Sequence, residues 1–445
     1  MSRSPFFLFL RFASVEKRFL SIKTHKLCLP LRPFMRRLIF FFIILCASLG
    51  ASNAYFQEVE DAEEMPVDSS LRVSLLTCSP GQAVYELYGH TAIRVKNERH
   101  RWDYVFNYGV FDFHQPNFVG RFVLGKCDYF VFPYRFDIFL AEYAERGSAV
   151  TEQVLNLQPR EATHLTQALL ENCDVEKRVY RYNIFRNNCT TKARDIIEEY
   201  IQGNVVYPLA QQRHTFRTLL HEYTDGHAWA EAGNDLLLGE DVDTLINERD
   251  EMFAPLYLMS YFDGAMIDRG LGRYDSLVRE RRVLLEEDPV RQQRAAEEEP
   301  SFPINPSVLG WGLLIAGVAT GVWEVRRRRA LWALDATLMT LQGVAGLLLA
   351  FLALFSSHPG VASNWQIWVM NPSALLFVLA VVKAERRERP CMYHPVAGLL
   401  LFLFLILYAW LPQEFSSLTL PLALLLLSRA LIHILIDRRR STSKQ

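Results

Sequence analysis

The sequence predicts an exported α+β domain followed by an all-α transmembrane bundle of about five helices. Three observations support this: a secretory signal pattern begins at Met35, residues 55–300 have the mixed charge of a soluble domain, and long apolar segments fill residues 301–445. Half of the 445 residues are hydrophobic while 22% are charged, so the two kinds must be segregated along the chain. The 49 acidic and 48 basic residues nearly cancel, which gives no electrostatic signature for a nucleic-acid partner.

Residues 35–54 are expected to direct export. Residues 35–54 combine two arginines, an apolar run and small residues at Ser52 and Ala54, which is the pattern of a secretory signal peptide. An uncleaved anchor is the alternative, and either one leaves the following domain outside the cytoplasm. Residues 1–34 are basic and patternless, so we expect translation to begin at Met35 and this N-terminal extension not to be translated; a signal peptide with an unusual extension is the alternative.

Residues 55–300 show strand patterns first and helix patterns afterwards, which indicates an α+β domain. The expected strands cover residues 71–77, 91–95 and 103–113, and a turn at residues 97–100 makes the last two a hairpin. The expected helices cover residues 136–146, 159–172 and 190–201, with a β-rich stretch at residues 178–184 before the last one. The aromatic run 129–134 is expected to be a core strand, with contact to acyl chains as the alternative. Residues 279–299, dense in Arg and Glu, are expected to form a solvated helix or a juxtamembrane linker.

Five apolar segments of membrane-spanning length follow. They cover about residues 307–323, 332–356, 365–384, 396–411 and 415–436. Their connections alternate between basic and neutral, so each basic loop reaches the cytoplasm if the first domain is exported. We therefore expect a multi-pass inner-membrane protein with a periplasmic N-terminal domain and a cytoplasmic C-terminus. Only Asp335 and His433 are recognised as ionisable residues in these segments, both near segment ends, which favours an anchor or a lipid-facing platform over a transporter.

Cys189 is the candidate nucleophile. It follows Asn188, a residue type that caps helices, and precedes a helical pattern, so it is expected at a helix N-terminus. The backbone N–H groups and the positive end of the helix dipole there favour a thiolate and can later hold an oxyanion. A structural disulfide is the alternative, since the exported domain also contains Cys78, Cys127 and Cys173.

His90 is the candidate base, because it begins a strand whose face on that side is polar. A third group usually orients such an imidazole. With the hairpin turn near residue 98 or 99, Asn107 lies opposite His90 and is the preferred third group. Asp103 and His114 remain alternatives, because a register change of one residue exchanges the faces. No CxxC, HxxxH or HExxH spacing occurs, so neither a metal site nor another cofactor is expected.

Several uncommon strings then occur in one order. They are SLLTCSPG from Ser74, GHTAIRV from Gly89, NYGVFDF from Asn107, NNCTTKARD from Asn187 and TFRTLL from Thr215. Over about residues 70–260 the chain resembles the N-terminal periplasmic domain of the Lnb family of bacterial lipoprotein N-acyltransferases, and the apolar part fits that family as well. The His-before-Cys order is similar to circularly permuted papain-like (NlpC-type) proteins, including relatives of lecithin:retinol acyltransferase. Lys192 stands where the family string is expected to have Arg, which keeps the charge but loses a bidentate contact.

The resemblance implies a permuted papain-like fold in which Cys189 is the nucleophile and His90 its base. The implied reaction moves an acyl chain from a membrane phospholipid onto the cysteine as a thioester, and then to the α-amine of the lipidated N-terminal cysteine of a lipoprotein. The implied partners are the phospholipid donor, the lipoprotein acceptor and membrane lipids. An NlpC-like cell-wall amidase or peptidase and a non-catalytic envelope scaffold are the alternatives.

Overall fold

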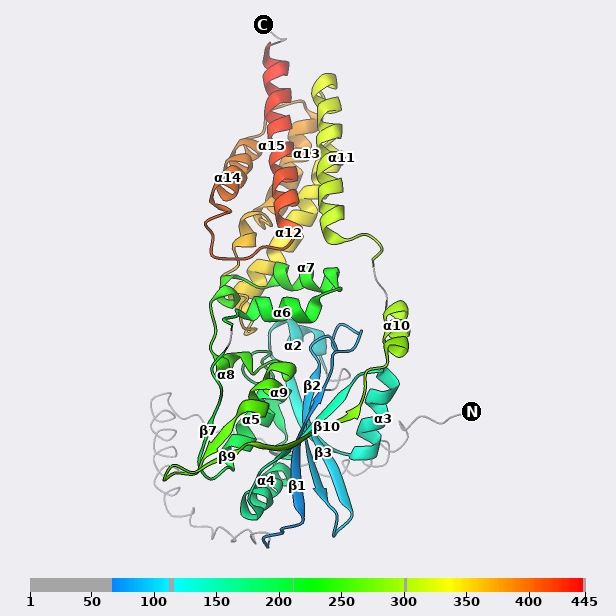
Figure 1. The fold of residues 1–445 in the computed structure, drawn as a ribbon. Helices are drawn as coiled ribbons and strands as arrows, with labels where there is room; N and C mark the ends of the chain where they lie inside the picture. Colours follow the sequence, from blue (N-terminus) through cyan, green and yellow to red (C-terminus); the bar gives the residue numbers. More distant parts are fainter. Residues whose placement is uncertain (1–65, 112–115, 211, 300–301, 443–445) are drawn as a thin grey trace, which may run out of the picture. The chain divides into compact units, whose positions relative to one another are not determined.

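The computed structural model describes residues 66–442 except 112–115, 211 and 300–301. The predicted signal peptide, the extension before it and the alternative site residue His114 lie outside the described residues. Within them, a sheet-rich α+β domain precedes a helical region, as Figure 1 shows. The α+β class and the helical C-terminal part are therefore confirmed.

A seven-stranded antiparallel sheet forms the centre of the exported domain, with the strand order β10–β5–β1–β2–β3–β4–β6. Its strands are β1 (Leu71–Cys78), β2 (His90–Asn97), β3 (Trp102–Val110), β4 (Asp128–Arg135), β5 (Val150–Leu155), β6 (Val179–Arg181) and β10 (Val278–Leu285). A second, three-stranded sheet contains β7 (Asn204–Val206), β8 (Met266–Asp268) and β9 (Tyr274–Ser276). The three predicted strands and the core strand predicted at residues 129–134 are all present, with small differences at their ends.

Helices cover both faces of the large sheet. Successive strand residues point to opposite sides, and apolar residues on both sides need to be buried. The helices of this domain are α2 (Phe118–Val123), α3 (Phe136–Arg146), α4 (Pro159–Asn172), α5 (Cys189–Glu199), α6 (Phe216–Thr224), α7 (Ala228–Leu237), α8 (Glu248–Glu251), α9 (Pro255–Gly264) and α10 (Pro289–Glu298). Ile93 and Phe106 face a core that includes α4, α5 and α9. Ala92 and Val105, one residue away on the same strands, face a second core under α3.

The β2–β3 hairpin is paired two residues away from the predicted register. Ile93 pairs with Phe106, and continuing this register brings Gly109, rather than Asn107, opposite His90. The four-residue turn contains Arg101 at φ 52°, a left-handed conformation that its residue type does not signal. Because a shift of two residues preserves the face, Asn107 stays on the same side of the sheet as His90.

Residues 279–299 differ from the predicted helix or linker. Most of the first half belongs to β10, which pairs with β5 at the edge of the sheet, and much of the second half forms α10, capped by Asp288. Five consecutive residues of β10 are exposed, so charged side chains follow one another without hydrophobic alternation. Charged residues are common on edge strands, which explains why this sequence resembled a solvated helix.

Each of the five predicted apolar segments contains a helix. The helices are α11 (Pro306–Arg327), α12 (Trp332–Phe355), α13 (Ser373–Arg386), α14 (Tyr393–Leu407) and α15 (Thr419–Thr442), and a 3₁₀ turn η3 (Trp365–Trp368) precedes α13. Four segments are long and apolar enough to cross a membrane: α11, α12, the continuous segment Trp365–Arg386 and most of α15. The helix α14 is apolar but shorter.

A buried ionic cluster joins four helices at the end of the bundle that carries the basic loops. Arg429 donates to Asp335 at 2.8 and 3.0 Å and to Glu324 at 3.0 Å. His433 bonds Asp335 at 3.0 Å and Glu385 at 2.8 Å. All five side chains are buried. The expectation that only Asp335 and His433 are ionisable here was wrong. Glu324 and Glu385 adjoin basic runs that resemble membrane flanks, and Arg429 lies inside the last apolar segment.

Hydrogen bonds join the exported domain to the loops of the bundle, and both belong to the unit Met65–Gln445. Ser357, just after α12, donates its backbone N–H to the Leu124 carbonyl at 3.0 Å. Asn364, just before η3, donates its side-chain amide to the Leu236 carbonyl at 2.9 Å. The end of α12 and the start of η3 therefore lie on the side of the bundle that faces the exported domain.

Candidate active site

Helix α5 begins at Cys189 because Asn188 caps it. Asn188 Oδ1 accepts hydrogen bonds from the backbone N–H groups of the second and third helical residues, each at 2.9 Å. Its Nδ2 donates to the carbonyls of Ile184 at 2.7 Å and Phe253 at 2.9 Å. The buried cap is thus held on both sides, and it fixes Cys189 in the first helical turn, where backbone N–H groups favour an anion.

The half-buried Cys189 thiol is hydrogen-bonded to the His90 side chain and to the Thr91 backbone N–H. Burial raises the pKa of the thiol, but the charge and hydrogen bond of His90, together with the Thr91 N–H, outweigh burial and lower that pKa from 9.0 to about 7. Thr190 Oγ1 lies 3.8 Å from the sulfur as a further polar neighbour. A thiol with this pKa is about half ionised at neutral pH and is a ready nucleophile.

The other cysteines of the described exported domain lack this activation. Cys78, Cys127 and Cys173 are free thiols, as is Cys189, so the structure contains none of the disulfides that the cysteine count left open. Burial raises the pKa of all three, in Cys173 to about 11. Among these four thiols, only Cys189 has a lowered pKa.

Asn107 holds the His90 ring in place. His90 Nε2 lies 2.9 Å from Asn107 Oδ1, and the Gly109 backbone N–H donates to the same oxygen at 2.8 Å. Because an amide oxygen only accepts, Nε2 carries the proton and leaves Nδ1 to exchange a proton with a reacting group. A Cβ atom on Gly109 would lie 2.7 Å from His90 Cε1, so this position needs glycine to leave room for the ring.

The thiol and the imidazole favour each other's charged forms. Burial lowers the pKa of His90, but the negative charge of Cys189 and the hydrogen bonds that Cys189 and Asn107 accept from the ring outweigh it, so that the pKa is raised above its ordinary value. A thiolate beside an imidazolium is the arrangement in which one group attacks and the other supplies a proton.

Asp103, the alternative third residue that the structure describes, does not contact His90. Asp103 accepts hydrogen bonds from Arg94 Nε at 2.8 Å and Nη2 at 2.6 Å, and Arg94 also donates to Glu152 at 3.0 Å. Asp103 therefore belongs to an ion-pair network. Of the residues predicted from the sequence, the structure brings together Cys189, His90 and Asn107.

Two cavities meet at His90. The first, which we call the aromatic cavity, measures about 150 Å³ and reaches Cys189. Its aromatic walls are Tyr85, Tyr88, Phe111, Tyr129, Tyr182, Tyr223 and Phe253. The second, which we call the charged cavity, measures about 250 Å³ and is lined by Glu86, Glu142 and Arg146 beside His90. The first suits an apolar chain next to the sulfur, and the second suits a charged group next to the imidazole.

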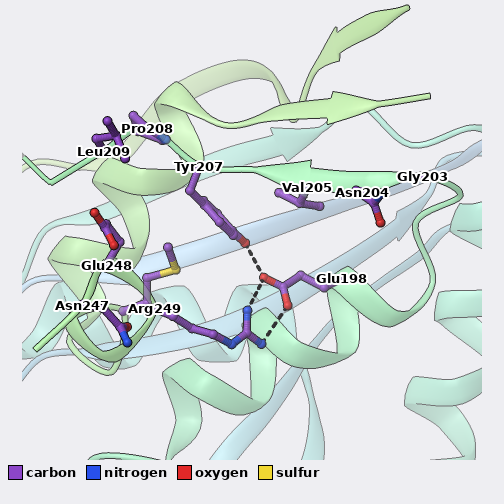
Figure 2. Close-up of a pocket in the computed structure, with 11 residues that line it drawn as sticks. Glu198, Gly203, Asn204, Val205, Tyr207, Pro208, Leu209, Asn247, Glu248 and Arg249 are labelled. Atoms are coloured by element: carbon purple, nitrogen blue, oxygen red, sulfur yellow. Dashed lines mark hydrogen bonds and ion pairs between the residues drawn. The ribbon is translucent and has the colours of Figure 1, made fainter. Parts of the chain in front are cut away.

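A larger groove of about 620 Å³ lies apart from these cavities and is drawn in Figure 2. Arg249 donates to Glu198 at 2.9 and 3.0 Å, and Tyr207 donates to the same carboxylate at 2.6 Å. Its eleven described lining residues include neither cysteine nor histidine and are absent from the walls of the aromatic cavity. Since the described lining of this groove offers neither a thiol nor an imidazole, the smaller cavities around His90 are the better candidate for chemistry.

Two groups of side chains among the described residues have possible metal-ligand atoms within 4.8 Å of one another. The groups are His221, Glu231 and Asp235, and Glu385, His394 and His433. Asp235 bonds both His221 and Arg217 at 2.8 Å, so its charge is already compensated. The rings of His394 and His433 lie parallel at 3.7 Å, and in-plane lone pairs of stacked rings do not converge on one ion. Neither group lines the aromatic or the charged cavity.

Three contributors to the site were not predicted from the sequence. Gly109 and Thr91 act through backbone N–H groups, which carry no residue-type signal. Tyr182 enters the aromatic cavity by stacking on Tyr129 with ring centroids 4.2 Å apart. Lys192, the departure from the family string, lies with its ammonium 5.2 Å from the Tyr180 ring.

Comparison with known protein families covers both parts of the chain. Residues 62–222 match the family model described as the Lnb N-terminal periplasmic domain, and residues 297–441 match the one described as the Lnb transmembrane domain. The first range includes Cys189, His90 and Asn107. No curated protein and no solved structure matches the chain.

Proposed function

The chain belongs to the Lnb family, and from this premise we propose that it is a cysteine-dependent acyltransferase of the cell envelope. It takes an acyl chain from a membrane phospholipid and transfers it to the α-amine of the lipidated N-terminal cysteine of lipoproteins. One observation carries the proposal: a thiol of lowered pKa, hydrogen-bonded to an imidazole that Asn107 orients, opens into an aromatic cavity. Such a site suits acyl transfer through a thioester.

The first half-reaction loads the enzyme. Cys189 Sγ attacks the carbonyl carbon of a phospholipid ester, and the new C–S bond gives a tetrahedral oxyanion that the N-terminus of α5 stabilises. When this intermediate collapses, the C–O bond to glycerol breaks and the His90 imidazolium gives its proton to the glycerol oxygen. A lysophospholipid leaves, and the acyl chain remains on the sulfur as a thioester.

The second half-reaction unloads the enzyme. The neutral α-amine of the acceptor attacks the thioester carbonyl, and the now neutral His90 takes a proton from the attacking nitrogen. The C–S bond breaks, which forms an amide and returns the thiolate to its place beside the imidazolium. His90 lines both cavities, which supports this order, because the same imidazole can serve an acyl-cysteine in the aromatic cavity and an acceptor in the charged cavity.

The membrane part explains how both substrates are found. We propose five membrane crossings that place residues 55–300 in the periplasm and the C-terminus in the cytoplasm of the inner membrane. A domain tethered to the bilayer meets lipid-anchored substrates at a high effective concentration. The alternation of basic and neutral loops supports this orientation.

The test follows the acyl chain on the protein. Purified full-length protein is mixed with phospholipid and a synthetic diacylated lipopeptide, and intact mass reports an acyl group on the enzyme and on the peptide. We expect a thioester at Cys189 when the acceptor is withheld, and its transfer when the acceptor is added. Cys189→Ala is expected to abolish both, and Cys173→Ala is the matched control that should leave both unchanged.

Muropeptides offered in the same experiment separate the amidase alternative. Cleavage of a muropeptide that depends on Cys189, without acylation of the lipopeptide, would refute the acyltransferase proposal. If wild type and Cys189→Ala give the same result with the lipopeptide and with the muropeptides, only the non-catalytic envelope scaffold remains.

A further inference from the structure

Helix α2 is an apolar element without a buried side chain. It reads Phe-Val-Gly-Arg-Phe-Val, and Val119 and Phe122 are 73% and 50% exposed. Apolar residues grouped on one short exposed helix mark a contact with another apolar phase. Lys126, three residues after the helix, is also exposed and places a positive charge beside this surface.

Hydrogen bonds from side chains to backbone carbonyls tie α2 to the point where α12 ends. The helix α12 finishes at Phe355, and its 24 residues are long and apolar enough to cross a bilayer. Ser356 Oγ donates to the Val123 carbonyl at 2.8 Å, and His358 Nε2 lies 2.6 Å from the Phe122 carbonyl. If α12 crosses the bilayer as proposed above, α2 lies at the level where α12 leaves the hydrocarbon, which is the depth of lipid headgroups and upper acyl chains.

The close approach requires glycine at residue 125. Gly125 has φ +66°, and a Cβ atom there would lie 2.5 Å from the His358 backbone nitrogen. Two backbone segments therefore meet here without side chains between them, which makes the connection between α2 and the end of α12 short and rigid.

A continuous series of aromatic rings leads from α2 to the aromatic cavity. Successive ring centroids lie 6.2 Å apart for Phe122–Phe118, 6.4 Å for Phe118–Phe111, 5.0 Å for Phe111–Tyr129 and 4.2 Å for Tyr129–Tyr182. The last three of these residues line the cavity that contains Cys189. The rings therefore connect α2 at one end with the cavity that contains Cys189 at the other.

We propose that α2 inserts Val119 and Phe122 into the outer leaflet of the membrane and that the aromatic series receives the acyl chain of the phospholipid donor there. The inference rests on the proposed acyltransferase function and adds the route of its lipid substrate. The donor leaves the bilayer along protein surface, so its acyl chain avoids water while the ester carbonyl reaches Cys189. The positive charge of Lys126 suits the phosphate of the headgroup.

The first experiment compares two valines of equal exposure. Val119→Asp puts a charge on α2, and Val175→Asp makes the same change at a 74% exposed position in the turn after α4. Each full-length protein is placed in nanodiscs of phosphatidylethanolamine and phosphatidylglycerol, and intact mass follows acylation of Cys189. We expect Val119→Asp to slow this loading at least tenfold, and Val175→Asp to leave it within twofold of wild type.

A water-soluble ester separates this inference from the function on which it rests. With p-nitrophenyl butyrate, which needs no extraction from the bilayer, both variants should acylate Cys189 at the wild-type rate. A defect of Val119→Asp that is equal for both esters overturns the proposal, and so does the absence of any defect. Slower transfer to the lipopeptide with unchanged loading also overturns it, because the surface would then serve the acceptor. Failure of the wild type to acylate Cys189 from either ester refutes the acyltransferase function itself.

A readout without catalysis tests the lipid contact directly. A phospholipid with a photoreactive diazirine in its acyl chain is incorporated into the nanodiscs around the Cys189→Ala protein. After illumination we expect crosslinks within residues 118–126, and at least a fivefold loss of them when Val119→Asp is added. Crosslinks confined to the helices of the bundle would overturn the proposal whatever the enzymatic result.

Discussion

Replacement of His90 tests the electrostatic origin of Cys189 reactivity. In the wild type, the imidazolium and its hydrogen bond offset burial and bring the pKa of Cys189 to about 7. His90→Gln removes the charge and keeps most of the volume. Burial, which raises the thiol pKa, is then the larger remaining influence, and we expect a pKa above the ordinary 9.0. A shift of about two units corresponds to about 2.7 kcal/mol of lost thiolate stabilisation.

The effect on reactivity is smaller than the effect on ionisation. At pH 7 the thiolate fraction falls from about one half to about one hundredth, a factor of about fifty. A more basic thiolate is also a better nucleophile, and a Brønsted slope of about 0.45 returns roughly eightfold. The alkylation rate at pH 7 is therefore expected to fall about sixfold, while the pH midpoint of alkylation moves by the full two units.

The assay measures iodoacetamide alkylation of each cysteine by peptide mass spectrometry between about pH 5 and pH 10. The pH midpoint of Cys189 alkylation should lie near 7 in the wild type. In His90→Gln it should lie above 9. Cys173, whose pKa is raised to about 11, is the control within the same sample and should not change. A midpoint that stays near 7 in His90→Gln would refute the ion-pair explanation and leave the helix N-terminus as its source.

Three other substitutions address the supports of the site and of the bundle. Asn107→Ala removes the acceptor 2.9 Å from His90 Nε2 and should slow loading of the enzyme by about ten- to a hundredfold, with quenched mass time courses as the measure; a rate within threefold of wild type would contradict the orienting role. Asn188→Ala leaves two helical N–H groups and two carbonyls without their partner and should destabilise the fold by about 2–4 kcal/mol, seen as a lower unfolding temperature in detergent; an unchanged temperature would speak against the cap. Arg429→Met leaves two buried carboxylates without their positive partner and should lower the free energy of unfolding by about 3–5 kcal/mol. Adding Glu324→Gln should restore part of that stability. Equal unfolding of the single and double variants would contradict this pairing.

The sequence predicted those elements of the fold that are specified locally. The helices at residues 136–146 and 159–172 agree with the structure to the residue, because their periodicity is clear and Gly147 or a capping box marks an end. The hairpin register and β10 depended on tertiary structure. The hairpin register depends on the left-handed conformation of Arg101, which its residue type does not indicate. The strand β10 depends on its position at the edge of the sheet, where charged residues face water.

The residues of the candidate site also fall into those that the local sequence predicts and those that depend on tertiary structure. Cys189, His90 and Asn107 were selected because their residue types and local positions have chemical meaning, and the structure brings them together. The aromatic walls come from β4, the segment before α5 and other distant parts of the chain, so no local pattern announces them. The Gly109 contribution also depends on the pairing of two strands, since its importance is the space that it leaves beside His90.

The buried ionic cluster has a consequence for how the protein is made. Glu324 and Asp335 precede Arg429 by 105 and 94 residues, so both carboxylates reach the membrane long before the helix that pairs them is synthesised. Unpaired carboxylates are costly in hydrocarbon, so we expect the early helices to pack fully only after α15 arrives. A chain that ends before residue 429 therefore keeps two acids without their arginine partner, and we expect it to be less stable in the membrane than the complete chain.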